Sequence, residues 1–190
     1  MPEGDTIHRA AARLRPVLVG RHVVRVTARR VTGSPPRPGT LVAEVEAVGK
    51  HLLVSFADGR VLRTHLGMTG RWDVYRPGER WLRPAHLARA VVEVEDAVAV
   101  CFAAPVAELD RAASVRGVEH LGPDLCRADA DLQVVLARMA TVPPPTMPIA
   151  DVLLDQRVAA GVGNVYKSEV LWACRVHPLT PVGALDAATR

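Results

Sequence analysis

The chain has 190 residues, of which 49% are hydrophobic and 23% charged, a composition that supports a buried core and excludes a disordered chain. The net charge of +4 permits nucleic acid as a partner without requiring it. The charged start and the lack of a long apolar run disfavour secretion and membrane insertion, so we expect a cytoplasmic protein. Among 24 basic residues only Lys50 and Lys167 are lysines, and arginine cannot replace an amine that must lose its proton.

The first predicted element is a helix over residues 5–18. Apolar residues recur there at helical spacing, Asp5 or Thr6 can cap the start, and Gly20 ends it. Pro16 is expected to end or kink the last turn.

Strands follow the helix. Alternating or Val-rich runs predict strands over 22–31, 41–48, 51–56, 61–66, 88–94 and 97–102. Asp58-Gly59 and Glu95-Asp96 predict hairpin turns between them. Residues 106–127 have no clear pattern.

The remainder of the chain predicts helices. One begins near Ala130, a stiff proline segment covers 142–148, and a second helix covers 149–160. Gly161–Asn164 interrupts the pattern before a third helix over 165–174. The chain is therefore expected to be of the α+β class, with an N-terminal antiparallel sheet domain (1–125) and an α-helical domain (126–190).

Two short segments have residue types suited to chemistry. If Met1 is removed, Pro2 presents a secondary amine that can attack an aldehyde carbon and form an iminium ion, and Glu3 beside it can move protons. The alternative is that this is merely a common start. The Gly161–Asn164 turn presents free N–H groups at a helix start, which suit an anion such as phosphate. An ordinary helical hairpin is the alternative there.

Longer motifs resemble the formamidopyrimidine-DNA glycosylase / endonuclease VIII family. The matching segments are Met1–Asp5, Val48–Leu53, His65–Gly70, His120–Leu125 and Leu153–Glu169. The PEGDTIH start is similar to the endonuclease VIII branch, especially its actinobacterial type.

The resemblance implies a β-sandwich followed by a helix–two-turn–helix module, with damaged double-stranded DNA as the partner of a monomer. It implies that the enzyme flips a base out of the duplex, that Pro2 attacks C1′ and expels the base, and that Glu3 moves protons. Lys50 would contact phosphate and support the site. Strand cutting by β- and δ-elimination then follows, and this chemistry needs no metal or organic cofactor.

The resemblance also assigns DNA contacts. Asn164 and Gly163 would bind phosphate through the turn, with Tyr166 beside them. Met68 would insert where the base left the stack, and His65 would touch phosphate. Without the motifs, Met68 would be read as a core methionine and His65 as a polar strand end. Arg63 and Arg71 are read as parts of a solvated face.

Three departures from the family pattern stand out. The family's zinc hairpin needs four cysteines, and Cys101, Cys126 and Cys174 cannot supply it, so we expect no zinc cofactor in this chain. Thr6 replaces an acidic residue common in the family. The resemblance places the Arg- and Phe-bearing loop of the formamidopyrimidine branch near 102–109, where this chain reads FAAPVAEL, and this difference favours oxidised pyrimidines over 8-oxoguanine as substrates.

The resulting hypothesis is a bifunctional DNA glycosylase and abasic-site lyase of base excision repair. Three alternatives stay open: a glycosylase of the 8-oxoguanine type, a DNA-binding module without catalysis, and a marginally stable remnant.

Overall fold

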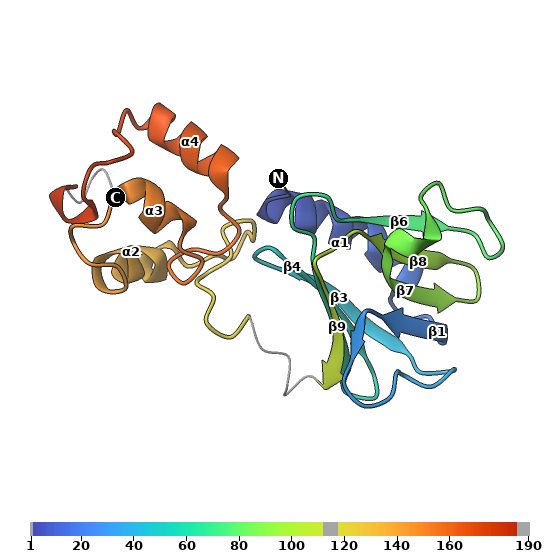
Figure 1. Cartoon of the computed structure of the whole chain (residues 1–190). Coiled ribbons are helices and arrows are strands. Elements are labelled where there is room, and N and C mark those ends of the chain that lie inside the picture. Colours follow the sequence, from blue (N-terminus) through green and yellow to red (C-terminus); the bar gives the residue numbers. More distant parts are fainter. Residues whose placement is uncertain (1, 112–117, 186–190) are drawn as a thin grey trace.

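The protein is described by a computed structural model that covers residues 2–111 and 118–185. Figure 1 shows a strand-rich region and a helical region side by side, with α1 between them. The helices are α1 (Gly4–Leu18), α2 (Leu132–Thr141), α3 (Ile149–Leu154) and α4 (Asn164–Ala173), with short 3-10 turns η1 (Ala85–Leu87) and η3 (Val182–Ala184). The strands are β1 (Val23–Ala28), β2 (Arg30–Val31), β3 (Val42–Val48), β4 (His51–Phe56), β5 (Arg60–His65), β6 (Arg71–Tyr75), β7 (Ala88–Val94), β8 (Val98–Phe102) and β9 (Val106–Arg111).

The strands form two sheets. One has the order β1-β7-β8-β6 and the other the order β2-β9-β5-β4-β3. All pairs are antiparallel except the short pair β2–β9, which is parallel. The expected α+β class, a sandwich with an N-terminal helix followed by helices, is confirmed.

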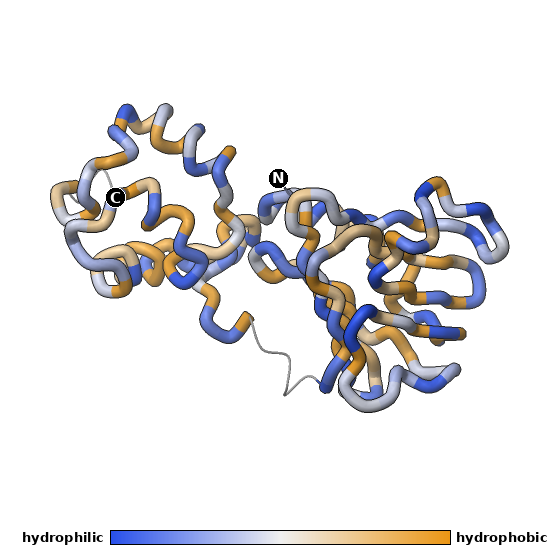
Figure 2. The backbone as a smooth tube through the Cα atoms, in the orientation of Figure 1, coloured by the Kyte–Doolittle hydropathy of each residue, from blue (hydrophilic) through white to orange (hydrophobic). Residues whose placement is uncertain are grey.

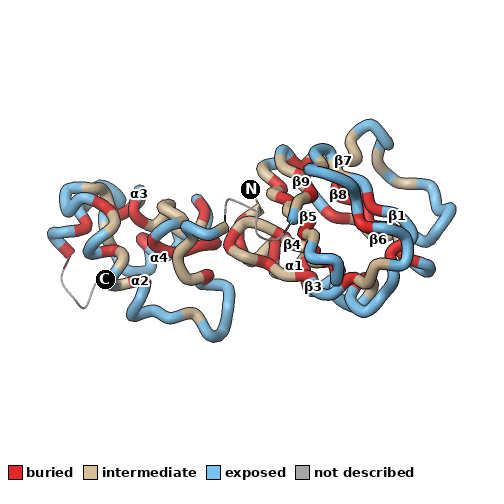
Figure 3. Tube along the Cα trace, turned by 90° about the horizontal axis from the view of Figure 1, so that it is seen from below, coloured by how far each residue is buried: buried red, intermediate tan, exposed pale blue. Residues whose placement is uncertain are grey.

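The core of this β-sandwich lies between the two sheets. Along β4 every second residue is buried, and Leu52 and Val54 are fully enclosed, because successive side chains of a strand point to opposite faces. Helix α1 packs on β3 and β4 with its apolar face, which includes Ile7 and Leu14. Figures 2 and 3 show that hydrophobic and buried segments coincide along these strands.

Several predicted boundaries differ from the structure. Strands β6 and β9 were not predicted: β9 lies in the segment without a clear pattern, and β6 lies in the stretch between the predicted strands 61–66 and 88–94. Pro16 neither ends nor visibly breaks α1, which continues to Leu18. No side chain of Asp5 or Thr6 caps α1, because the residue at the N-cap position is Glu3. The hairpin β7–β8 around Glu95-Asp96 is as predicted.

The helical region has its own small core. It includes Val135 and Met139 of α2, Val152 of α3 and Leu171 of α4. Asp131 caps α2 by accepting hydrogen bonds from the next backbone N–H groups. The proline segment 142–148 joins α2 and α3 within this region. None of the described helices is both long and apolar enough to cross a membrane.

The predicted helix over 149–160 is wrong in its second half. Helix α3 ends at Leu154, and the next residues form turns that pair with the segment before α2. Ala160 donates its N–H to the Pro123 carbonyl and forms a bridge with Asp124. The extended chain can thus satisfy backbone groups of both segments.

Candidate active site and nucleic-acid interface

The chain start lies at the junction of the two regions. Pro2 is half-buried, and Glu3 is buried with 2% exposure at the N-cap of α1. The N–H of Gly4 donates to the carbonyl of Gly161 over 2.9 Å. The amine proposed as nucleophile is therefore attached to a segment that the helical region holds in place.

The carboxylate of Glu3 accepts hydrogen bonds from the first turn of α4. Its two oxygens accept from the backbone N–H groups of Gly163 (3.1 Å), Val165 (2.7 Å) and Tyr166 (3.2 Å). Charge-assisted bonds of this kind, at the positive end of a helix dipole, are among the strong ones. Within the predicted turn, the Gly163 amide is therefore occupied by a side chain of the protein itself, and the Asn164 amide is not among the three donors.

Two glycines make this contact possible. A Cβ on Gly163 would lie 2.4 Å from Cδ of Glu3, which is far too close for any side chain. Gly161 has a φ of +94°, a conformation that glycine adopts without strain. The glycines of the predicted turn therefore admit Glu3, where the sequence suggested that they admit phosphate.

Lys50 lies in the turn between β3 and β4, close enough to Glu3 for the two charges to interact. Burial lowers the pKa of Lys50, and the negative charge of Glu3 opposes that shift. The predicted catalytic residues are Pro2, Glu3 and Lys50. Glu3 and Lys50 are close enough for their charges to interact, and Pro2 directly precedes Glu3 in the chain.

Two histidines adjoin Lys50. The rings of His51 and His65 lie 4.9 Å apart. Burial, with further contributions from His65, Arg63 and His120, lowers the pKa of His51 to about 3. Burial, with Lys50 and Arg63, also lowers the pKa of His65.

Arg63 is the cation that faces these rings. Its side chain is only 13% exposed and pairs with Glu108 at 2.6 Å and with His51 at 3.3 Å. The expectation of a solvated position is therefore wrong for Arg63. Arg71 is half-exposed and pairs with Asp73.

Met68 lies on the turn after β5 and is 70% exposed, so it is no core methionine. The imidazole of His65 accepts the N–H of Gly67 within the same turn. The neighbouring β8–β9 turn touches this turn, since Pro105 packs beside Gly67. The segment 102–109, expected to be a loop, is mostly strand, and only residues 103–105 form the turn.

The predicted contacts on α4 point in different directions. Asn164 is exposed, and its Oδ1 accepts a hydrogen bond from Lys167 Nζ at 3.1 Å. The backbone N–H of Tyr166 donates to Glu3, and Tyr166 and Lys167 line the same cavity. Asn164 and Tyr166 are exposed, whereas Lys167 is half-buried.

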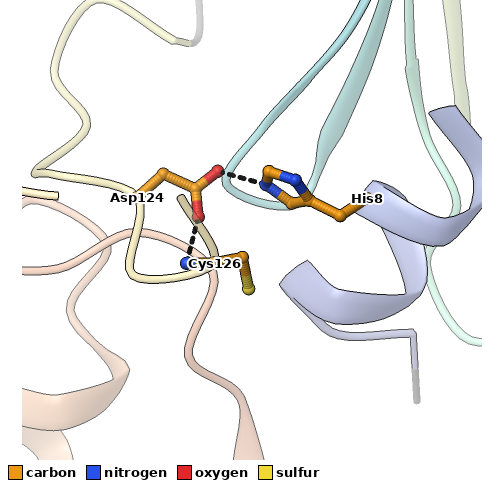
Figure 4. Close-up of side chains that lie close together, drawn as sticks. All are labelled: His8, Asp124 and Cys126. Atoms are coloured by element: carbon orange, nitrogen blue, oxygen red, sulfur yellow. Dashed lines mark hydrogen bonds and ion pairs between the residues drawn. The ribbon is translucent and has the colours of Figure 1, made fainter. Parts of the chain in front are cut away.

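Asp124 is a junction residue that the sequence reasoning did not single out. It is buried, and its Oδ2 accepts the N–H of Gly49 at 2.8 Å and contacts His8 Nε2 at 2.9 Å. Its Oδ1 accepts the N–H of Cys126 at 2.9 Å (Figure 4). Asp124 is itself a residue of the weak motif His120–Leu125, so this motif was the sequence signal that could have found it.

The cysteines do not fit the family's zinc hairpin. Cys101 is buried in β8, where burial and Asp73 raise its pKa to about 12, while Cys126 and Cys174 are exposed on separate segments. Within 2–111 and 118–185 no four-cysteine set exists to hold that ion.

Two family models match the chain. The formamidopyrimidine-DNA glycosylase N-terminal domain matches residues 1–105, and the H2TH domain of the same enzymes matches residues 121–189. The chain belongs to the formamidopyrimidine-DNA glycosylase family. Curated relatives at 42% and 39% identity are named endonuclease 8, and one at 36% is named formamidopyrimidine-DNA glycosylase.

Two of the relatives come from actinobacteria. The chain is 42% identical over 190 residues to a probable endonuclease 8 2 of Streptomyces coelicolor, covering 98% of this chain and 68% of that protein. It is 38% identical over 192 residues to the DNA-(apurinic or apyrimidinic site) lyase Nei2 of Mycolicibacterium smegmatis, covering all of this chain and 73% of the relative.

Solved structures of the family share the fold. The Lactococcus lactis Fpg protein bound to DNA containing an abasic site superposes with a TM-score of 0.75 at 21% identity, over 100% of this chain and 72% of that one. A complex of the same protein with a THF-DNA and an inhibitor gives a TM-score of 0.78 at 22% identity, over 99% and 72% of the two chains.

Proposed function

We propose that the chain is a bifunctional DNA glycosylase and abasic-site lyase of base excision repair that acts on oxidised bases, with pyrimidines preferred. The observation that carries the proposal is the contact of Glu3 with the start of α4. This contact anchors the chain start, with Pro2 and Lys50, against the helical region. Family membership and the names of the relatives support the same activity.

The proposed reaction begins at Pro2 after removal of Met1. The lone pair of the Pro2 nitrogen forms a bond to C1′, and the pair of the N-glycosidic bond leaves with the base. The nitrogen then loses its proton, and its lone pair opens the C1′–O4′ bond as O4′ takes up a proton, which leaves an iminium ion between the Pro2 nitrogen and C1′. This electron sink acidifies C2′, so that proton loss there expels the 3′ phosphate and a second elimination expels the 5′ phosphate.

Glu3 and Lys50 have distinct roles in this proposal. The Glu3 carboxylate, held by three backbone donors, favours the cationic iminium next to it and exchanges protons with the sugar. Lys50, whose pKa is lowered by burial, is available for proton transfer and for contact with phosphate.

DNA is proposed to bind along the exposed parts of both regions. Asn164 and Lys167 would hold phosphate with their side chains, because the amides of Gly163, Val165 and Tyr166 already donate to Glu3. Met68, exposed on the β5–β6 turn, would fill the space left by the flipped base, and His65 would lie beside it. In this proposal residues 1–125 supply the chemistry and 126–190 hold the DNA, at the chromosome in the cytoplasm, without a cofactor.

Borohydride trapping on duplex DNA with an abasic site tests the proposal. Reduction of the iminium should link the protein covalently to DNA, and the adduct should disappear in a form that retains Met1, because the Pro2 nitrogen is then part of a peptide bond. Intact-mass measurement establishes which start is present. Glu44→Gln, a change at an exposed position of β3, is the control and should still trap.

The competing DNA-binding module makes the opposite prediction. It should bind abasic duplex DNA with affinity that falls steeply with salt and give neither adduct nor strand cutting. A folded preparation with a verified Pro2 start that binds but never traps would refute catalysis by this chain. Comparison of oxidised pyrimidine and 8-oxoguanine duplexes then tests the substrate preference.

A further inference from the structure

A cluster of three different donor side chains lies at the junction, apart from Pro2 and Lys50. His8 of α1 meets Asp124 and Cys126 of the segment before α2, and one nitrogen, one carboxylate oxygen and one sulfur of the three lie within 4.8 Å of one another. Figure 4 shows the imidazole and the carboxylate facing each other, with Cys126 beside them. Asp124 and Cys126 belong to one segment, and His8 precedes Asp124 by 116 residues in the chain.

The carboxylate at the centre of the cluster is held in advance. Gly49 donates to Oδ2 and Cys126 donates to Oδ1, so the plane and position of the Asp124 carboxylate are fixed from two sides. The second of these bonds turns the chain so that Cys126 returns toward His8. Such hydrogen bonds to a ligating carboxylate orient it for an ion.

The Cys126 thiol fits against α1 because residue 4 is a glycine. A Cβ on Gly4 would lie 2.8 Å from Sγ of Cys126, so the sulfur rests directly on the first turn of α1. The carboxylates of Glu3 and Asp5 are near enough to interact with the same thiol. The cluster therefore lies in a region of negative charge that attracts a cation.

A fourth position is open. His8 and Cys126, together with Asp5, line a cavity of about 520 Å³ between α1, α3 and α4. A water molecule or another small ligand can enter from this side. One imidazole, one carboxylate and one thiolate, with room for a fourth ligand, form a donor set that Zn²⁺ takes in proteins.

We propose that His8, Asp124 and Cys126 bind a divalent transition metal ion, Zn²⁺ by preference. The ion takes the place of the proton shared by His8 Nε2 and Asp124 Oδ2, which lie 2.9 Å apart, and displaces the proton of the Cys126 thiol. It clamps α1 to the segment that leads into the helical region. This site is separate from the four-cysteine hairpin of the family and involves a different set of residues.

Titration of the reduced, full chain with Co²⁺ tests the proposal without any measurement of activity. Bound at this site, Co²⁺ should saturate at one equivalent and show the near-ultraviolet charge-transfer band of a sulfur ligand. Cys126→Ser should abolish the band. Cys174→Ser is the matched control, because Cys174 is also exposed but lies on the far end of α4.

His8→Gln separates ligation from hydrogen bonding. Glutamine can still donate to Asp124, so the junction stays closed while an imidazole ligand is lost. We expect Zn²⁺ affinity at least about tenfold weaker in this variant, and a rise of the melting temperature with Zn²⁺ in the wild type only. A Co²⁺ spectrum without the sulfur band, or equal Zn²⁺ affinity of the wild type and both site variants, would overturn the site and leave a hydrogen-bonded contact.

Discussion

The β-sandwich and the helical region bury their apolar residues to very different extents. Among residues 2–111 and 118–185, the main sandwich cluster has 24 buried residues, whereas the cluster of the helical region has nine. The helical region also leaves large apolar side chains in solvent, among them Trp172 (84% exposed), Leu179 (68%) and Leu132 (61%). A small core stabilises a region weakly, so this region depends on its contacts with the chain start.

Several of those contacts are hydrogen bonds. Glu3 binds the start of α4, Gly4 donates to Gly161, and Asp124 joins the turn before β4 to α1. The same residues surround the proposed nucleophile. Stability of the helical region and positioning of Pro2 are therefore expected to change together, and the following predictions test that link.

The largest effect is expected for Glu3→Gln. The carboxamide nitrogen cannot accept the N–H groups that now point at the carboxylate, and the negative charge beside Pro2 is lost. We expect trapping and strand cutting to fall by roughly 10²–10⁴-fold. Single-turnover kinetics on abasic duplex measure this loss. Glu44→Gln, at an exposed position of β3, should leave the rate within about twofold. An equal loss in Glu44→Gln would show that the effect is not specific to the contact of Glu3 with α4.

Gly163→Ala is expected to have the next largest effect. The new Cβ would overlap Cδ, Oε1 and Cγ of Glu3, all within 2.6 Å. Crowding of this kind costs about 1–3 kcal/mol in the free energy of unfolding, measured by urea denaturation. In the Glu3→Ala background those atoms are absent, so the same substitution should cost clearly less. Equal costs in both backgrounds would show that the overlap is not the cause.

A matched pair of core substitutions sharpens the comparison of the two regions. Val54→Ala in the sandwich and Val152→Ala in the helical region both remove two methyl groups at fully buried positions. Each should cost roughly 1–3 kcal/mol. By hydrogen exchange, Val152→Ala should raise exchange in α2, α3 and α4 alone, whereas Val54→Ala should raise it throughout. Uniform exchange in both would mean that the regions unfold as one unit.

The smallest effect concerns pH and lies within the sandwich. His51 has a pKa of about 3 in the fold, against 6.5 unfolded. Between these values the unfolded chain binds the extra proton, so stability is full above about pH 6.5 and falls as the pH drops towards 3. At pH 5 this amounts to at most about 2 kcal/mol, since His51 is partly exposed. Chemical denaturation across this range should show a shallower loss in His51→Gln, and the exposed His177→Gln should retain the wild-type slope.

Much of the fold follows from local pattern. The β4 and β7 boundaries and the hairpin at Glu95-Asp96 are as predicted, because alternation and turn chemistry are local signals. The predicted helix over 149–160 ends early for a non-local reason: Ala160 pairs with Pro123 and Asp124. The same limit applies to β9, which pairs with β5 over a long separation in the chain.

The candidate site was also predicted only where the signal is local in sequence. The motifs predicted that Pro2, Glu3, Lys50 and the Gly161–Asn164 turn belong to one site, and the structure brings these segments to the junction. The motifs did not indicate that Glu3 accepts the very amides assigned to phosphate, nor that Asp124 links Gly49, His8 and Cys126.

The sequence by itself determined the family, the order of sheet and helices, and the residue types available for chemistry. Periodicity, turn residues and short motifs are properties of neighbours along the chain, so they can be read without a fold. Only the tertiary structure decided which donor meets which acceptor. Glu3 and Val165 are separated by 162 positions yet lie 2.7 Å apart, and such a contact exists only because packing of α1 on the sandwich brings the chain start to α4.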